Sequence, residues 1–528
     1  MGMETSIVVI RKNVKTTINN IMSENIKIPV NYIKGQFSNP KKIFIDIGFK
    51  DLKKIEYQRQ QSIGNLGFKE PFQAWSGMII NSGDDFVPAK IRYKGNEVKV
   101  DLRLKGDMTD HIEGDKWSFR IKVKGNETLF GMKTFSIQDP KTKAYLDSFV
   151  YYLALKKADI MAIRYDFIEA AINGENKGIF ALEEHFEKQL IEDNKRREGV
   201  LLKFSEDFMA QEQLNNAHEF DHQFDLYEFV DKNQLSWFYN SKIETFANNK
   251  ILKDPVLSKQ FKEARNLLEL FRRGSLDVSE VFDVDVLAKY FAITTVLGGH
   301  HCSRWHNIRF YYNPVTDLIE PIGFDACPRE KVEWIMENYL PDCLINENNC
   351  PKKIEMLEKL IFRDKVFFEK YIQELEIVSQ KSYLDDLYSE LNGEIKRALN
   401  VLHKEYPSYH FSTEDFYNKQ KKIRNMLNPV RGPAAYLQKS LPSQNKIILS
   451  IGNTDILPLE IISIKYNNSV NFGLINKNKI LQPKITEGSI EYQKYEFKIP
   501  IGFVMDTAIF RNLLLNYKIV VPPVLQHP

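Results

Sequence analysis

The segment from Trp305 to Asp325 constrains the fold more than any other, because it predicts a β-hairpin with a polar residue at each open end. Residues 308–312 alternate in the manner of a strand, and residues 318–324 form a second apolar run. The Asn313-Pro314 pair between the two runs predicts a turn. Pairing of the runs would bring the open ends of the hairpin to about one strand spacing, ~5 Å.

Asn307 and Asp325 stand at those two ends. An amide oxygen and a carboxylate at that separation can share one hard cation such as Mg²⁺, which takes oxygen ligands. The alternative is a surface hairpin whose ends are polar because they face water. The hairpin alone does not decide between a metal site and a surface turn, so the decision depends on the sequence upstream.

Two alternating segments upstream predict a basic face on a β-sheet. Residues 98–105 and 116–124 each place apolar side chains on one face and polar ones on the other, and a loop rich in Gly and Asp separates them. If the segments pair, cations gather on one side of the sheet and repel each other unless an anion balances them. A triphosphate is such an anion, because Arg grips its oxygens bidentately and Lys acts as a point charge.

The candidate phosphate ligands flank the loop between these two segments. They are Arg103, Lys105, Lys116 and Arg120. The remaining cations of the face, Lys99, Lys122 and Lys124, fit an ordinary solvated sheet face equally well.

These blocks, with the segments between them, resemble the CotH-type kinases, a family of atypical protein kinases first associated with bacterial spore coats. The resemblance runs from about Ile91 to Asp325. Its elements, in the order of the family pattern, are Arg103 to Gly106, Lys116 to Lys122, Asn173-Gly174, Gly178 to Glu184, Gly199 to Lys203, His306-Asn307 and Asp325. No single element is specific, but all of them in this order are a strong signal.

The resemblance implies an α+β fold with a two-lobed, protein-kinase-like core, in which the N-lobe holds an antiparallel sheet and the C-lobe is helical. It implies transfer of the γ-phosphate of ATP to Ser or Thr of a protein substrate, with Mg²⁺ or Mn²⁺ bound, since protein kinases hold their metal ions with an Asp and an Asn. It also implies an extracytoplasmic location, although no secretory signal is visible at the start of the chain.

By resemblance, each candidate residue receives a role. The residues implied at the phosphates are Arg103, Lys105, Lys116 and Arg120. The segment Glu183 to His185 would lie near the nucleotide, and the nucleotide ligands would be Glu184 and Lys203. The metal ligands would be Asn307 and Asp325, and Asn307 would also be catalytic.

The chain departs from the family pattern at the catalytic base. Family members carry an Asp before the His-Asn pair, but Thr294 to His306 contains no carboxylate. His301 is the candidate proton acceptor, which predicts a rate that falls as the pH drops through about 6.5. Failing that, the base would come from Asp221 or Asp225. A catalytically silent binding or adaptor protein therefore stays open as an alternative, as does transfer of AMP on the same fold.

A second departure concerns the helix predicted over Tyr145 to Lys157. A kinase needs an acid there to hold the phosphate-binding Lys, and only Asp147, a short side chain, is available. Both departures weaken the case for activity, and the missing carboxylate before His306 predicts a slow or silent site.

Composition limits the other classes of function. Hydrophobic residues make up 43% of the chain and charged residues 27%, which is a globular balance. The 73 basic and 70 acidic side chains leave a net charge of only +3, which argues against a dedicated nucleic-acid binder. No apolar run approaches the ~20 residues of a membrane-spanning helix. We therefore expect a nucleotide and a protein substrate as partners, with no nucleic acid and no transmembrane segment.

The 528 residues predict more than one domain. Residues 1–84 form an N-terminal extension, extended before residue 45 and helical at Phe49 to Leu66. The kinase-like domain is expected to span residues 85–440, with an N-lobe at about 85–203, a polar, mobile insertion with short helices at Phe204 to Ser241, and a C-lobe at about 240–440. Within it we predict helices at Glu184 to Arg196 and Val284 to Leu297 and helical pieces at Phe411 to Leu437. A β-rich module at 445–528 completes the chain.

The four cysteines are clustered, at Cys302, Cys327, Cys343 and Cys350. Clustering suits one or two local disulfides, which would need an oxidising compartment, and free buried thiols fit equally well. The nearby histidines lack a recognised spacing for zinc.

Overall fold

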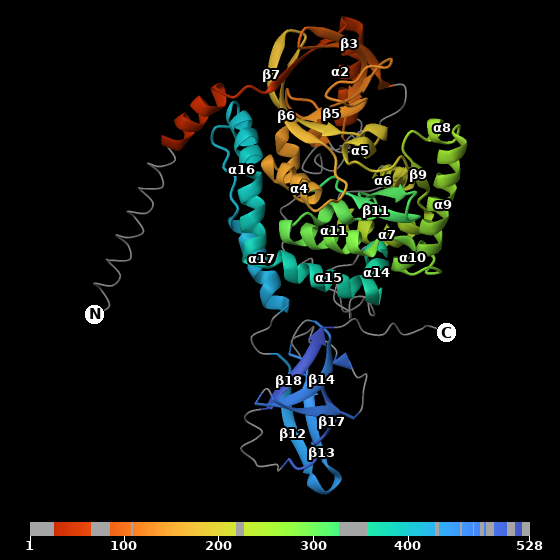
Figure 1. The fold of residues 1–528 in the computed structure, drawn as a ribbon. Helices are drawn as coiled ribbons and strands as arrows, with labels where there is room; N and C mark the ends of the chain where they lie inside the picture. Colours follow the sequence, from red (N-terminus) through yellow and green to blue (C-terminus); the bar gives the residue numbers. More distant parts are fainter. Residues whose placement is uncertain are drawn as a thin grey trace.

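The computed structural model describes residues 26–64, 85–106, 109–217, 226–326, 356–427, 432–454, 457–467, 469–475, 480–481, 490–503 and 513–519. Within them the chain forms a mixed α+β structure, which confirms the predicted class at that level. Figure 1 shows a β-barrel at one end, a helical body around a small sheet in the middle, and a further β-sheet at the other end.

The first part of the molecule is a closed barrel of seven strands in the order β1-β2-β3-β4-β5-β7-β6. The strands are β1 (Lys41–Ile47), β2 (Val87–Tyr93), β3 (Asn96–Leu104), β4 (Phe119–Val123), β5 (Thr134–Gln138), β6 (Tyr165–Ile172) and β7 (Glu175–Glu184). The predicted pairing of the two basic segments is confirmed in β3 and β4, where Leu102 pairs with Ile121. The predicted antiparallel sheet needs one correction. β1 pairs antiparallel with β2 but parallel with β6, and this closes the sheet into a barrel.

Residues before the predicted N-lobe belong to this barrel. β1 is its closing strand, and α2 (Phe49–Gly64), which was predicted as a helix, packs Ile55 into the barrel core. The structure therefore includes β1 and α2 in the unit that the sequence began at residue 85. The prediction of an extended chain before residue 45 is wrong for residues 26–36, which are helical. This N-terminal helix docks at Gly35, where an added Cβ would lie only 2.4 Å from Lys404 N.

The middle of the molecule is a helical body with its own large core. Its helices are α4 (Leu146–Lys157), α5 (Lys188–Asp193), α6 (Asp207–Ala217), α7 (Leu226–Asn240), α8 (Asn248–Ile251), α9 (Pro255–Arg272), α10 (Val278–Val281), α11 (Val284–Leu297), α14 (Met356–Phe362), α15 (Lys365–Val378), α16 (Lys381–His403) and α17 (Glu414–Leu427). A four-stranded sheet in the order β11-β10-β8-β9 lies among them: β8 (Leu201–Phe204), β9 (Ile243–Thr245), β10 (Arg309–Asn313) and β11 (Leu318–Ile322).

Two predictions for this body need correction. The helix expected over Glu184 to Arg196 is shorter, because β7 continues to Glu184 and α5 begins only at Lys188. The polar segment at residues 204–241 was expected to be a mobile insertion with short helices, and its described part holds two helices, α6 and α7. Trp237 and Phe238, near the end of α7, are fully buried in the core, so this end of the segment is structural.

The last part of the described chain is a seven-stranded sheet with a separate core, as the β-rich pattern predicted. Its strands are β12 (Ala434–Leu441), β13 (Lys446–Gly452), β14 (Leu459–Tyr466), β15 (Val470–Leu474), β16 (Ile480–Leu481), β17 (Tyr492–Lys498) and β18 (Leu513–Ile519). It begins at β12, in a region that the sequence assigned to helical pieces. No helix in the described part of the chain is both long and apolar enough to cross a membrane.

Candidate active site

The predicted hairpin is present as β10 and β11. Arg309 pairs with Ile322 at its open end and Asn313 with Leu318 at its turn. Asn307 and Asp325 flank the open end, as the sequence indicated. The turn η4 (His300–Ser303) brings one more side chain, His301, to both of them.

One atom, His301 Nε2, links the two ends. Asn307 Nδ2 lies 3.0 Å from it and also donates to the His301 carbonyl at 3.0 Å, while Asp325 Oδ2 lies 3.5 Å away. Because the Asn307 amide group faces a carbonyl oxygen, Nε2 must be the unprotonated acceptor of its second hydrogen. The structure therefore brings together Asn307, His301 and Asp325, with the amide donating to the imidazole.

Asp325 is held by a cation that the sequence did not single out. Lys143, the last residue of η3 (Pro140–Lys143), donates from Nζ to Asp325 Oδ1. Asp325 itself has φ 52°, a left-handed conformation that non-glycine residues adopt at a cost of about 1 kcal/mol or more. This strained residue contacts a partly buried cation, and strained backbone of this kind is concentrated at functional sites.

Four neighbouring strands of the barrel, β3, β4, β5 and β7, each contribute one polar side chain to a row. Arg103 on β3 pairs with Arg120 on β4, Arg120 with Ser136 on β5, and Ser136 with Glu183 on β7. Directly paired residues point to the same face of a sheet, so these four side chains share one face. Ser136 is fully buried, and its Oγ has no hydrogen-bond partner among the described residues.

Lys105 joins this row just beyond the end of β3. Its Nζ donates to Glu183 Oε1 at 3.0 Å and to Gln138 Oε1 at 2.5 Å, and Gln138 Nε2 donates to Glu183 Oε2 at 3.1 Å. Burial alone would raise the pKa of Glu183, but the charges of Lys105, Lys143 and Arg120 outweigh it and lower that pKa to about 2. The acid that holds the lysine therefore comes from β7, and not from the helix that carries Asp147.

The cluster holds more positive than negative charge. Burial lowers the pKa of His185, and the charges of Arg120, Lys122, Lys203 and Arg103 lower it further. The guanidinium of Arg120 also contacts His185 Nδ1. Burial, followed by the charges of Arg103 and Arg120, lowers the pKa of Lys122, which places that cation in the same group. Cations crowded in this way favour an anion with several oxygens as their partner.

Two predicted site residues lie outside the cluster. Lys116 Nζ donates to Ile179 O at 3.0 Å, Glu405 Oε1 at 2.5 Å and Tyr406 OH at 3.0 Å, so it joins the barrel to the segment after α16. Glu184 accepts from Arg164, at 2.9 Å from its backbone N–H and also from its guanidinium. The structure does not bring either side chain together with Arg120 and Asp325.

The model of the CotH kinase protein family matches residues 91–429, which is more than half of the chain. The chain belongs to the CotH kinase protein family. A search of curated proteins gave no match. Membership implies a kinase-type phosphotransfer function, with a nucleotide of the ATP type and a substrate. The match begins in β2 and ends beyond α17, so β1, α2 and the C-terminal sheet of this CotH kinase lie outside it.

The imidazole of this CotH kinase stays neutral at physiological pH. Burial, followed by the charges of Arg304, Lys143, His306 and His300, lowers the pKa of His301 well below 6.5. Because this pKa is lowered, the fall in rate that was expected at about pH 6.5 is expected at a lower pH. The alternative acids, Asp221 and Asp225, lie outside the described residues.

The turn that carries His301 is fixed by buried groups that the sequence gave no reason to select. His300 Nε2 lies 3.0 Å from Glu358 Oε1 on α14, and Ser303 Oγ donates to the same oxygen at 2.6 Å. The hydroxyls of Tyr151 and Tyr290 each lie 3.0 Å from Cys302 Sγ. Cys302 is buried against these two hydroxyls, and the other three cysteines lie outside the described residues. Among the described residues, no group of three His, Cys, Asp or Glu side chains could hold a metal ion.

The loop between β3 and β4 contacts α2, a helix that lies outside the family match. Arg59 Nε donates to Ile112 O at 2.7 Å, and its guanidinium lies 5.0 Å from the centre of the Trp117 ring. Burial, with the charges of Lys105 and Lys143, lowers the pKa of His111 to about 3, which places this loop beside the cluster. Arg59 therefore helps to position the loop that follows Lys105.

Proposed function

We propose that this CotH kinase binds ATP with Mg²⁺ or Mn²⁺ between its barrel and its helical body, in a two-lobed, kinase-like core. It then transfers the γ-phosphoryl group to a Ser or Thr of a protein. One observation carries the proposal. Arg103, Arg120, Ser136 and Glu183 form a row, Lys143 lies close enough to lower the pKa of Glu183, and the same Lys143 contacts Asp325. Its excess of cations and its buried, unpartnered hydroxyl fit a triphosphate.

In this proposal Lys105 is the fixed phosphate ligand. Glu183 and Gln138 hold its ammonium group, so it loses little conformational entropy when an anion binds. With its low pKa, Glu183 keeps its charge at physiological pH, and its carboxylate holds the ammonium group of Lys105 in position. Arg120 and Arg103 add charge-assisted contacts beside it.

Asp325 and Asn307 are the residues that would hold the divalent cation, since a carboxylate and an amide oxygen suit Mg²⁺. A bound Mg²⁺ supplies positive charge that neutralises the phosphate oxygens during transfer. Lys143 would have to release Asp325 for the carboxylate to turn toward a metal. Asn307 would have to present its oxygen and give up its hydrogen bond to His301.

His301 is the proposed acceptor of the substrate hydroxyl proton. It is neutral, and its side chain is 35% exposed, but its Nε2 is engaged by Asn307. Turning Asn307 toward a metal would free Nε2 for the incoming hydroxyl. Phosphoryl transfer relies mainly on positioning and electrostatics, so an imidazole base is sufficient.

A silent adaptor is the second candidate function. The observation that favours it is the absence of a carboxylate from residues 294–306. AMP transfer would use the same nucleotide site as phosphoryl transfer.

The test begins with thermal-shift titration of ATP with Mg²⁺ or Mn²⁺, followed by intact-mass analysis of an added protein. We expect stabilisation and a mass gain of one phosphoryl group. A mass gain of AMP would replace the proposal with AMP transfer. Stabilisation without a mass gain would favour the adaptor, and the absence of stabilisation would contradict the nucleotide site.

We also propose an extracytoplasmic location, as the family resemblance implies. The measurement is fractionation of cells that express the natural gene. Recovery of the protein only with cytoplasmic markers would contradict this proposal.

A further inference from the structure

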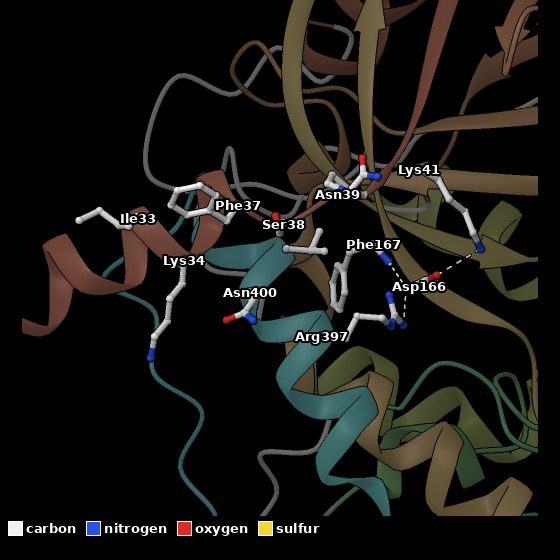
Figure 2. Close-up of a pocket in the computed structure, with 12 residues that line it drawn as sticks. Ile33, Lys34, Phe37, Ser38, Asn39, Lys41, Asp166, Phe167, Arg397 and Asn400 are labelled. Carbon is white, nitrogen blue, oxygen red and sulfur yellow. Dashed lines mark hydrogen bonds and ion pairs between the residues drawn. The ribbon is translucent and has the colours of Figure 1, made fainter.

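A cavity separate from the candidate active site lies where the N-terminal helix meets the barrel and α16. It has a volume of about 710 Å³, within the ~300–1,000 Å³ typical of ligand pockets. Its walls come from residues 33–41, from the start of β6 and from α16, and it shares no residue with the cluster around Glu183. Figure 2 shows these walls, with the N-terminal helix across the cavity from Asp166.

One end of the cavity carries an excess of positive charge. Arg397 on α16 donates to Asp166 Oδ1 at 3.0 Å, and Lys41 on β1 donates to Asp166 Oδ2 at 3.4 Å, as Figure 2 shows. Two cations thus share one carboxylate, and both side chains are about half exposed. An incoming carboxylate can therefore bind here without displacing Asp166. Lys34 is a further cation of the lining, but Figure 2 shows it across the cavity on the N-terminal helix, with its side chain directed away from Lys41 and Arg397.

The other end of the cavity is apolar. Ile33 and Phe37 lie one turn apart on the N-terminal helix, so their side chains share one face of it. They are 54% and 87% exposed, while Phe167 and Val401 of the lining are buried. A partner side chain that covered Ile33 and Phe37 would remove a large apolar surface from water, which is favourable.

The cavity is held in shape by contacts around it. The N-terminal helix is fastened to the segment after α16, since Asn31 Nδ2 donates to Pro407 O at 3.0 Å. Behind it, Lys42 and Lys404 both bind Glu169, at 2.5 and 2.6 Å. Walls fixed in this way need little reorganisation when a ligand binds.

We propose that this cavity binds an acidic segment of another protein that carries a large apolar side chain beside its carboxylates. The cations Lys41 and Arg397 select the acidic groups, and Ile33 and Phe37 select the apolar one. A simple anion would leave the apolar end uncovered, and an apolar ligand would leave the cations without a partner. The cavity lies apart from the nucleotide cluster. Peptide binding to the cavity is therefore expected whether or not the protein transfers a phosphoryl group.

The test is fluorescence anisotropy with the full chain and no nucleotide. The probe is a fluorescein-labelled peptide of sequence Glu-Glu-Phe-Glu-Asp-Leu-Glu. We expect saturable binding that weakens about tenfold or more in Arg397→Glu, because a charge-assisted contact is lost and a repulsive one is gained. The matched control is Lys396→Glu, with the same charge change at the exposed neighbour on α16, which does not line the cavity.

Lys41→Glu repeats the test from a different strand, in case Arg397→Glu does not fold. Phe37→Ala tests the apolar end against Phe49→Ala, which removes another largely exposed ring from α2. We expect Phe37→Ala to weaken binding of the peptide and Phe49→Ala to leave it unchanged. An unchanged circular dichroism spectrum in all five variants would confirm that they are folded.

The proposal is overturned if the peptide does not bind, or if Arg397→Glu and Lys396→Glu weaken binding equally. Equal binding of a peptide with Ala in place of Phe and Leu would also overturn it, because the apolar end would then have no role. Competition by inorganic phosphate, or binding of vesicles of phosphatidylglycerol in place of the peptide, would reassign the site to a simple anion or to a lipid surface.

Discussion

Replacement of Glu183 by Gln tests how the candidate phosphate site is held together. The substitution keeps the shape of the side chain but removes its charge, and it leaves the ammonium group of Lys105 without its carboxylate. The pKa of Glu183 is about 2, compared with 4.5 for an ordinary Glu. That difference corresponds to roughly 3 kcal/mol of folding stability at neutral pH. We therefore expect Glu183→Gln to unfold in urea with a free energy lower by about 3 kcal/mol at pH 7.

The pH dependence of this loss follows from the direction of the pKa shift. Because the pKa of Glu183 is lowered in the folded state, its contribution is complete above pH 4.5 and disappears as the pH falls toward 2. The difference in unfolding free energy between the wild type and Glu183→Gln should therefore be constant at neutral pH and shrink below about pH 4.5. Urea unfolding, followed by circular dichroism from pH 7 to the lowest pH at which both proteins fold, measures it.

The matched control is Glu184→Gln, at the neighbouring buried carboxylate that binds Arg164 outside the cluster. Both variants should lose stability, but only Glu183→Gln should weaken ATP binding. The reasoning is refuted if Glu183→Gln has wild-type stability at pH 7, if the difference does not shrink in acid, or if both variants bind ATP equally.

Three further predictions concern the same site. Arg120→Ala should weaken ATP by about 1.5–3 kcal/mol and leave adenosine unchanged in calorimetric titrations, whereas Lys116→Ala should leave ATP affinity unchanged. Equal weakening of ATP and adenosine would count against phosphate contact. Arg59→Ala should raise the KM for ATP more than it lowers kcat, because it loosens the loop beyond Lys105, and Lys53→Ala on the same helix should change neither. A fall in kcat alone would argue against this positioning role. His301→Ala should lower kcat with little effect on ATP affinity, and unchanged turnover would place the proton acceptor elsewhere.

Local patterns in the sequence were sufficient for individual elements. The alternation in residues 98–105 and 308–312 gave β3 and β10, because side chains of a strand point to opposite faces in turn. The limits of α11 were also predicted, since Asp283 caps its start and Gly298, with φ 69°, ends it. The approach of Asn307 and Asp325 followed from the hairpin alone.

Contacts between distant segments could not be predicted in the same way. Glu183 meets Lys105 only because β5 and β7 pair across the barrel, and no local pattern contains that register. The sequence pattern therefore led us to expect the acid on the helix that carries Asp147. Lys143 gave no signal, because a lysine in a short turn is usually solvated and its contact with Asp325 depends on how the barrel meets the helical body.

The closure of the barrel was missed for a related reason. The strand β1 lies far from β6 in the sequence, and its parallel pairing leaves no turn between them to mark it. Residues 26–36 were expected to be extended because their apolar residues show no clear period. Their helix is stabilised by its contact with the end of α16, which is a tertiary effect.

We propose that Asp325 holds a divalent cation together with ATP, next to the cation cluster of the barrel. Electron paramagnetic resonance of Mn²⁺ measures this directly, because bound and free Mn²⁺ give different signals. Titration of the wild type in the presence of ATP should show a bound Mn²⁺ that is lost in Asp325→Ala, while circular dichroism shows that the variant is folded. Mn²⁺ binding that needs no ATP, or that persists unchanged in folded Asp325→Ala, would contradict the claim.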